Sequence, residues 1–366
     1  MGRYGQAAPD SSRGRDGLRA ASGPREHPRT QAALAEVLGV DTETVQGWES
    51  GRRPLANMRA GALLELRRHL PTIGADAALV GWLDAAMDAD RILAAGLQPD
   101  GGRPHPLAGW VHTRETAHML AWALNGTTPP ALTGCVSRSR RGPVAAAPQL
   151  APADRHVFFD HLRAVTEHAA TQGPGGALLH RQALYLASYD HSPDAAAWTA
   201  QALHGRRDVL ARRGWSPQWA AARSTATALA RLGDPQPLHD FIDRALADDD
   251  TAEAANLNYW ALWLGALPVP QSDDAFMGDR GLPGWDALTL LRALARGLVK
   301  DPGFVDLYAH SLWALLTVFP WLPQAAGPTA RDLHVRSAHL LDEVPLTARA
   351  RRELGHVHYV LSRKST

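Results

Sequence analysis

Residues 30–54 read TQAALAEVLGVDTETVQGWESGRRP, and this stretch specifies the local structure of the N-terminal part of the chain. Its first apolar residues recur at helical spacing, and Gly39, which tolerates a left-handed backbone, is expected to end that helix. Asp41 is a good N-cap for a second helix over Thr42–Ser50, and the Gly and Pro that follow should end it. The sequence therefore predicts two short helices joined by a tight turn.

The two predicted helices are expected to cross closely. Ala35 leaves room for the crossing because its side chain is a single methyl group. Four apolar side chains are expected to seal the inner corner: Leu34, Leu38, Val45 and Trp48. This order and spacing are typical of a helix-turn-helix, with a plain helical hairpin that has no DNA role as the alternative.

The same stretch resembles the helix-turn-helix of phage-repressor (XRE or Cro-type) transcriptional regulators. In that family a "T-Q-x-x-L-A-x-x-L-G-V" helix and turn precede a recognition helix that ends in "W-E-x-G". The agreeing positions are Thr30, Gln31, Leu34, Ala35, Leu38, Gly39, Val40, Val45, Trp48, Glu49, Gly51 and Pro54. The layout is also similar to that of actinobacterial regulators in which a long, Ala- and Arg-rich helical domain follows this motif. The resemblance implies a protein that binds double-stranded DNA with its second helix in the major groove.

Three residues follow from the resemblance as candidate phosphate contacts. Gln31, at the start of the first helix, would meet a phosphate together with the backbone N–H groups of that helix. Arg52 and Arg53, just past the recognition helix, are placed for the next phosphates. These contacts would orient the protein on the duplex without specifying sequence.

Four residues of the second helix are candidates for contacts with base edges. Gln46 suits adenine, Glu43 suits the amino group of cytosine, and Thr42 or Thr44 offers a methyl group to thymine. Glu43 has a second interpretation, as a solvated acid that the helix dipole favours in a first turn. Gly47 stands where similar regulators often have a side chain that reaches a base, and a helical glycine costs about 1 kcal/mol.

The composition sets limits on partners and compartment. The chain has 366 residues, with 38 Lys plus Arg against 37 Asp plus Glu, so its formal charge is only +1. A nucleic-acid site must therefore rest on local geometry rather than gross charge. Cys135 is the single cysteine, which excludes a disulfide framework and a cysteine-based metal site. No apolar stretch is long enough to span a membrane, so we expect a cytoplasmic protein.

The chain is expected to be all-α and to divide into five parts. A polar, flexible leader over 1–28 precedes the helix-turn-helix domain at 29–70, and connecting helices follow at 71–132, among them one over 75–97. Residues 133–153 combine arginines and prolines without periodicity, which is typical of a linker. The remainder, 154–366, is expected to be a regulatory or interaction domain.

The last part is a succession of predicted helices separated by short Gly, Pro or Asp turns. Their ranges are 154–171, 177–188, 194–213, 217–232, 236–247, 251–266, 285–299, 303–318, 328–342 and 346–361. Antiparallel helix pairs of this kind stack into an irregular helical repeat of the tetratricopeptide or HEAT type, and a compact bundle would have the same pattern. The tryptophans of this part are expected in the core: Trp198, Trp215, Trp219, Trp260, Trp263, Trp285, Trp313 and Trp321.

Signals of catalytic or metal chemistry are weak. The histidines do not pair at metal-ligand spacing, the GPGG at 173–176 lacks the Lys-Ser/Thr of a phosphate loop, and no G-x-S-x-G occurs. We therefore expect no catalytic set, no metal and no cofactor, and do not expect an enzyme.

Two functions from different classes fit these observations. The first is a transcriptional regulator that acts as a homodimer, because paired half-sites raise the affinity of a module with few contacts. Its C-terminal domain would serve dimerisation or bind a peptide, protein or small-molecule effector. The second is a helical-repeat interaction scaffold whose helix-turn-helix is degenerate. Salt dependence of duplex binding separates them.

Overall fold

The computed structural model describes residues 30–50, 53, 55–98, 104–133, 149–281, 284–299, 301 and 303–363. Across these residues the regular secondary structure is helical and no strand occurs, which confirms the predicted all-α class. The predicted leader over 1–28, Arg52 and most of the predicted linker lie outside the described residues.

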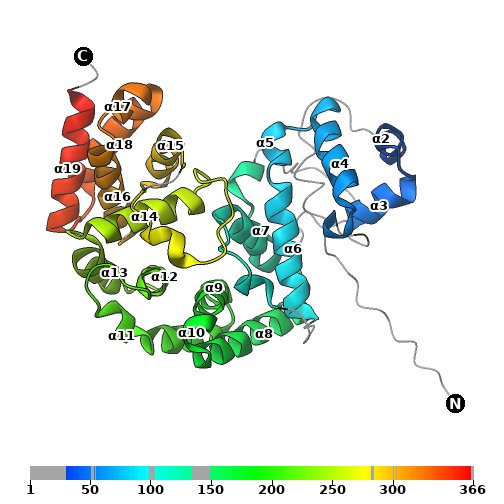
Figure 1. The fold of residues 1–366 in the computed structure, drawn as a ribbon, viewed down its shortest axis with the longest axis horizontal. Helices are drawn as coiled ribbons and strands as arrows, with labels where there is room; N and C mark the ends of the chain where they lie inside the picture. The colour runs from blue at the N-terminus through cyan, green and yellow to red at the C-terminus, as the bar shows by residue number, and fades with distance from the viewer. Residues whose placement is uncertain are drawn as a thin grey trace. The chain divides into compact units, whose positions relative to one another are not determined.

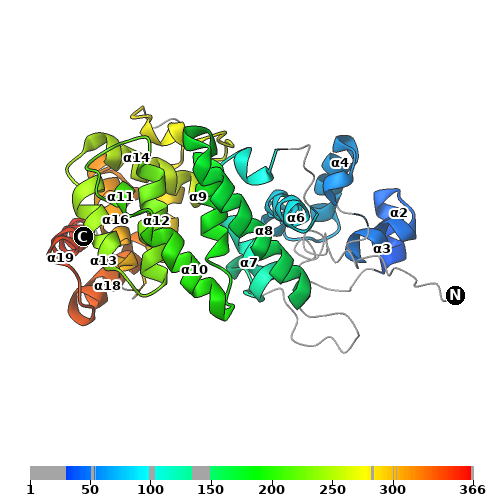
Figure 2. The same cartoon turned by 90° about the horizontal axis from the view of Figure 1, so that it is seen from below.

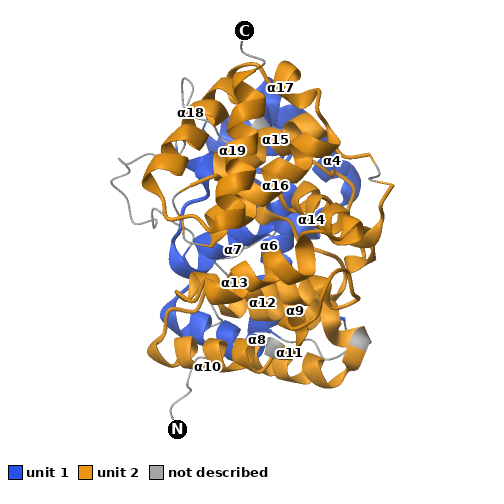
Figure 3. Ribbon diagram, turned by 90° about the vertical axis from the view of Figure 1, so that its left-hand side faces the viewer, with its two compact units in different colours: residues 1–106, 115–162 blue, residues 107–114, 163–366 orange. Residues whose placement is uncertain are grey.

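The chain forms two compact units, coloured separately in Figure 3. Unit 1 consists of residues 1–106 and 115–162, and unit 2 of residues 107–114 and 163–366. The segment 133–153, predicted as a linker, falls within the sequence range of unit 1.

The first helices of the chain are short. From the N-terminal end they are α2 (Gln31–Leu38), α3 (Thr42–Ser50), the 3-10 helix η1 (Leu55–Asn57), α4 (Ala60–Thr72), α5 (Ala77–Val80), α6 (Leu83–Leu97), η2 (Pro106–Ala108), α7 (Arg114–Asn125), η3 (Pro130–Leu132) and α8 (Pro152–Thr171). The single helix predicted over 75–97 is in fact two helices, because Gly81 and Trp82 form a turn between α5 and α6.

Unit 1 has a small core that begins at the corner of α2 and α3. Its buried members are Ala35, Val45, Trp48, Leu55, Leu66, Leu70, Val80 and Leu83. The last two belong to α5 and α6, so the described helical segments from α2 to α6 share one core. Farther along, α6 and α8 approach closely at Gly96, where a Cβ would collide with the Phe158 ring. Only glycine permits this approach.

Unit 2 continues as a series of helices. They are the 3-10 helix η4 (Gly173–Gly176), α9 (Ala177–Ala187), α10 (Pro193–His204), α11 (Arg207–Leu210), α12 (Trp219–Arg231), α13 (Gln236–Phe241), the π-helical turn η5 (Ile242–Leu246), α14 (Asp250–Trp263), η6 (Asp274–Gly278), α15 (Ala287–Gly297), α16 (Phe304–Val318), α17 (Leu322–Ala325), α18 (Pro328–Glu343) and α19 (Ala348–Ser362). In Figures 1 and 2 they follow one another from green to red.

Most of the predicted C-terminal α-helices are confirmed, and the α-helical predictions differ from the structure at three places. The range 194–213 is divided between α10 and α11, because the helix ends at Gly205. The range 236–247 changes from α-helix to a π-helical turn, and the one-turn helix α17 was not predicted. Trp321, at the start of α17, leaves 51% of its surface exposed, so the prediction that it lies in the core is wrong.

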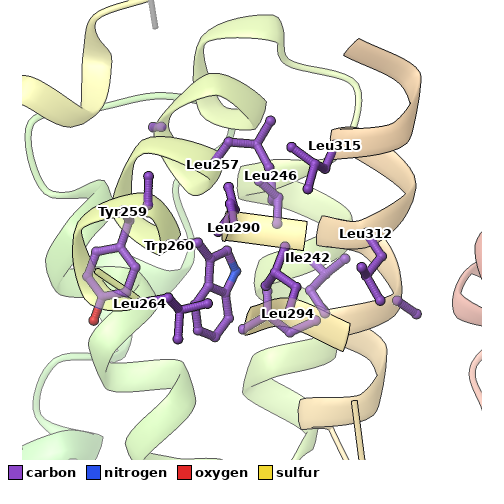
Figure 4. Close-up of a cluster of buried hydrophobic side chains, with 14 of the residues drawn as sticks. Ile242, Leu246, Leu257, Tyr259, Trp260, Leu264, Leu290, Leu294, Leu312 and Leu315 are labelled. Carbon is purple, nitrogen blue, oxygen red and sulfur yellow. The ribbon is translucent and has the colours of Figure 1, made fainter. Parts of the chain in front are cut away.

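The core of unit 2 gathers around Trp260. Figure 4 shows this side chain of α14 among leucines that include Leu290 and Leu294 of α15 and Leu312 of α16. Trp219 is only 1% exposed, and its indole N–H donates to the Ala245 carbonyl oxygen at 2.7 Å. Trp260 and Trp219, both predicted in the core, thus hold neighbouring helices together, Trp260 by packing and Trp219 also by its hydrogen bond.

Candidate nucleic-acid interface

The turn between α2 and α3 forms as the sequence predicts. The Thr30 hydroxyl caps α2 by accepting the Ala33 backbone N–H at 3.2 Å. Gly39 ends the helix with a φ of 64°, and the next backbone N–H, of Val40, donates to the Ala35 carbonyl oxygen at 3.0 Å. A left-handed glycine of this kind closes a helix because it carries no Cβ.

The start of α3 is held by Asp41. Its carboxylate accepts the backbone N–H of Thr44 at 2.5 Å, which confirms the predicted N-cap. Hydrogen bonds from the side chain and the backbone of Thr44 lower the pKa of Asp41 below its ordinary value. The cap thus satisfies one of the free N–H groups of the first turn and fixes where α3 begins.

The inner faces of the two helices seal the corner. Ala35, Val45 and Trp48 are 3%, 0% and 5% exposed, while Leu34 and Leu38 are half-buried against them. The predicted packing of the corner is therefore confirmed. We call residues 30–50 the α2–α3 corner; Gln31, Asp41 and Glu43 are exposed on it.

Gln31 and Gln46 meet across the corner. The Gln46 side-chain N–H donates to the Gln31 side-chain oxygen at 3.2 Å, although the residues are fifteen positions apart. Gln31 is exposed in the first turn of α2, and Gln46 is half-buried on α3. The structure therefore brings together a predicted phosphate contact and a predicted base contact, and each amide orients the other.

Thr42, Glu43 and Thr44 occupy the first turn of α3, and only Glu43 is fully exposed. Thr44 has partners on both sides: its backbone N–H binds Asp41, and its hydroxyl accepts from the Arg53 guanidinium at 2.6 Å. Thr44 is therefore hydrogen-bonded to Asp41 and Arg53, a relationship that the sequence pattern does not predict.

Arg53 lies over the position of Gly47. A Cβ on Gly47 would stand 2.9 Å from Arg53 Cδ, and the Arg53 backbone N–H donates to the Gly47 carbonyl oxygen at 3.0 Å. This packing brings the exposed guanidinium of Arg53 back to the first turn of α3. In the sequence, the only indication of this contact is that Arg53 follows the helical Gly47 by six residues.

The charge around this corner is mixed. Among residues 30–48 and Arg53, the exposed charged groups are acidic at Glu36, Asp41 and Glu43 and basic at Arg53. Arg52, another predicted phosphate contact, lies outside the described residues. The described surface thus offers polar donors and acceptors, and its exposed charged groups are more often acidic than basic.

Other classes of site find less support in the part of the chain that the structure describes. No group of three or more His, Cys, Asp or Glu side chains there is arranged to hold a metal ion. No helix there is long and apolar enough to cross a membrane.

Comparison with known proteins adds no relative. The chain matches no protein-family model, no curated protein and no solved structure.

Proposed function

We propose that this protein is a DNA-binding transcriptional regulator of the XRE type, which inserts α3 into the major groove of double-stranded DNA. The observation that carries the proposal is the hydrogen bond between Gln46 and Gln31 on the outward side of the α2–α3 corner. A recognition helix can contact particular bases only if other contacts to the DNA phosphates fix its position in the groove. The paired amides link the α2 N-terminal turn, suited to a phosphate, with the helix that would face the bases.

The remaining candidate contacts divide by position. Arg53 would reach a phosphate beside the first turn of α3, where Thr44 sets the orientation of its guanidinium. Thr42, Glu43 and Gln46 would face base edges, and the free acceptor of Gln46 would be available once its N–H is bound to Gln31. In this arrangement Thr44 acts mainly through Arg53.

Unit 2 supplies the larger part of the regulator. Its successive helices pack on near neighbours, such as α12 on α13 and α18 on α19, which supports an irregular helical repeat. We propose that this domain dimerises the protein and receives an effector or partner, so that two copies of α3 meet half-sites about one helical turn apart.

Selection from a random-duplex pool at near-physiological salt tests the DNA role. Wild-type protein should enrich a two-fold symmetric motif, and the Thr42→Ala/Glu43→Ala/Gln46→Ala variant should not, because it loses base contacts while Val45 and Trp48 keep the corner packed. The binding constant should fall with salt at a slope of about −0.9 for each neutralised phosphate. Equal enrichment by the variant would contradict readout through α3.

A scaffold with a degenerate helix-turn-helix is the second candidate. The acidic groups at Glu36, Asp41 and Glu43 favour it, because a DNA surface generally carries an excess of Lys and Arg. If no duplex is enriched by folded protein, with or without anionic effectors, the scaffold role is preferred.

A further inference from the structure

Unit 2 contains four arginines whose charges act on a shared set of tyrosines. Arg114 stands at the first residue of α7, Arg181 on α9, and Arg223 and Arg231 on α12. The rings that contact or adjoin them are Tyr185 on α9, Tyr259 and Trp260 on α14, and Tyr308 on α16. We call this set the arginine–tyrosine cluster.

Arg223 is the deepest of the four. It is 3% exposed, and its guanidinium lies 3.9 Å from the centre of the Tyr259 ring and 4.6 Å from that of Trp260. Its Nε donates to the Asn256 side-chain oxygen over a long 3.4 Å, whereas its Nη2 has no hydrogen-bond partner. A buried guanidinium is thus held by ring faces and leaves donor capacity unused.

Only one of the four arginines has a carboxylate partner among the described residues. Arg181 is 7% exposed and binds Asp274 through two nitrogens, Nε at 3.0 Å and Nη2 at 2.5 Å. That pair is bidentate and satisfied. Arg223 contacts Asn256 and aromatic rings instead. No carboxylate of the described residues therefore balances the charge of Arg223, whereas Asp274 balances that of Arg181.

The other two arginines of the cluster, Arg231 and Arg114, are less buried than Arg223 and Arg181. Arg231 is exposed, stacks 4.6 Å over the Tyr185 ring and donates to the Ser188 hydroxyl at 3.1 Å. Arg114 is half-buried, and its Nε is buried without a partner. Burial raises the pKa of Tyr185 and of Tyr308, and the charge of Arg114 opposes that shift at both. These tyrosines are therefore neutral and do not balance the arginines.

A buried cation without a counter-charge is costly, and an anion that reaches it recovers that cost. Burial lowers the pKa of Arg223 to about 10, which still leaves the guanidinium charged at neutral pH. Arginine forks match oxyanions, because paired N–H groups donate to two oxygens at once. Unpartnered donors on Arg223 and Arg114 in one cluster thus have the chemistry of a receptor for an oxyanion.

We propose that the arginine–tyrosine cluster binds a small oxyanion ligand, carrying a phosphate or carboxylate group, between Arg223 Nη2, Arg114 and Arg231. Arg231 is the exposed member, so it forms the entrance and shifts from Ser188 to close over the bound group. Arg181 keeps its bond to Asp274 and acts as a positioning residue for the site.

The ligand would be the effector of the regulator, and that role rests on the proposed function, whereas anion binding itself does not. The four arginines come from three separate helices, α7, α9 and α12. Binding between Arg223, Arg231 and Arg114 would tie α12 to Arg114, which belongs to the same unit. A ligand there would stiffen this part of unit 2 and raise its stability by mass action.

The test uses the full-length protein without DNA. Sodium phosphate, pyrophosphate and citrate are titrated at constant ionic strength against a sodium chloride reference, with calorimetry, melting temperature and tryptophan fluorescence as readouts. At least one probe should bind saturably in the micromolar to low millimolar range, and the stronger of the phosphate and citrate arms identifies the favoured oxyanion. No saturable binding of any probe to folded protein overturns the proposal.

Variants locate the binding. Arg231→Ala and Arg114→Ala should each weaken it by about tenfold or more, as expected for a lost charge-assisted hydrogen bond. Arg331→Ala, which removes an exposed arginine of α18, is the matched control and should bind as wild type does. Arg223→Met should abolish binding, and the two milder variants decide the matter if Arg223→Met does not fold. Equal weakening in Arg331→Ala, or none in Arg231→Ala and Arg114→Ala, would place the anion elsewhere and overturn the proposal.

Failure of the DNA role is distinguishable from failure of this site. The Thr42→Ala/Glu43→Ala/Gln46→Ala variant alters only the α2–α3 corner and should bind the anion normally. If wild-type protein binds the anion but selects no duplex in its presence or absence, the anion site stands and the regulator proposal falls.

Discussion

The stem of Arg53 occupies the space that a side chain on Gly47 would need: a Cβ there would stand 2.9 Å from Arg53 Cδ. The same arginine donates from its guanidinium to the Thr44 hydroxyl at 2.6 Å. In the sequence, Gly47 suggests that a base contact is missing. In the structure, the absence of a side chain at Gly47 lets the Arg53 guanidinium fold back over α3. The conformation of Arg53 therefore depends on Gly47.

Gly47→Ala tests this relationship. The added methyl group must displace the exposed Arg53 stem, which removes its bond to Thr44, while alanine improves helix propensity by about 1 kcal/mol. The two effects oppose each other, so we expect the melting temperature to change little. Under the proposed function, duplex affinity should fall as far as in Arg53→Ala, with a shallower salt slope, measured by fluorescence anisotropy across a salt series.

Gly61→Ala is the matched control for that substitution. Gly61 lies in α4 and is exposed, and a Cβ added there would have no other atom within 4 Å. The substitution should raise stability by up to about 1 kcal/mol and leave duplex affinity unchanged. Duplex binding by Gly47→Ala that equals wild type would show that Arg53 is not a contact.

Ala35→Leu should break the α2–α3 corner. Ala35 is 3% exposed where α2 meets α3, and the larger side chain has no room there. Overpacking of this kind typically costs about 1–3 kcal/mol. Urea unfolding followed by circular dichroism should detect the loss, and duplex binding should disappear with it. Ala32→Leu changes an exposed residue of the same helix and should be neutral; a comparable loss there would rule out packing as the cause.

Local structure was predictable where a few neighbouring residues decide it. Gly39 ends α2 because of its backbone freedom, and Asp41 begins α3 because its carboxylate reaches an N–H three residues later. Both effects operate within one turn of helix. The C-terminal helices were predictable for a related reason, since Gly and Pro interrupt helices at the residue where they stand.

Contacts between distant residues were not predictable. Arg223 meets Tyr259 across thirty-six positions, and no local pattern specifies that an arginine on α12 faces a ring on α14. The same limit applies to Trp321, whose exposure depends on how the one-turn helix α17 packs. Side-chain periodicity shows which face of a helix is apolar but not which helix covers it.

Ser311 joins three polar groups in the core of unit 2. Its hydroxyl accepts from the Asn256 amide and the Trp260 indole, both at 2.9 Å, and donates to the Leu307 carbonyl oxygen at 2.7 Å. Ser311 and Asn256 are fully buried. The serine is thus the shared acceptor for two donors that have lost contact with water.

Ser311→Ala should therefore be strongly destabilising. Each buried donor left without an acceptor costs about 1–3 kcal/mol, and the loss should appear in the urea midpoint of unit 2. Thr317→Ala is the control on the same helix, because Thr317 is exposed and its hydroxyl bonds only to the Trp313 carbonyl oxygen. A loss no larger than that of the control would contradict the importance of this network.

His310 joins α16 to α14 and α19 through its two ring nitrogens. Nδ1 lies 3.0 Å from Glu353 Oε1, and Nε2 lies 3.1 Å from Glu253 Oε2. The imidazole is 0% exposed. Burial by itself lowers the pKa of His310, but the hydrogen bonds and charges of Glu253 and Glu353 outweigh it and raise the pKa to about 9. The histidine is therefore cationic at neutral pH and holds the two carboxylates together.

This pairing predicts a stability that falls at alkaline pH. Because the pKa is raised in the folded protein, the stabilisation is complete below the unfolded value of about 6.5 and is lost as pH rises through about 9. The raised pKa corresponds to about 3 kcal/mol. Urea unfolding at intervals from pH 6 to 9.5 should show this decline in wild type and a flatter profile in His310→Gln, which has no imidazole to titrate. His339→Gln, which removes an exposed histidine beside Glu343, should keep the wild-type slope. Parallel profiles for wild type and His310→Gln would show that His310 does not link α14, α16 and α19 as a cation.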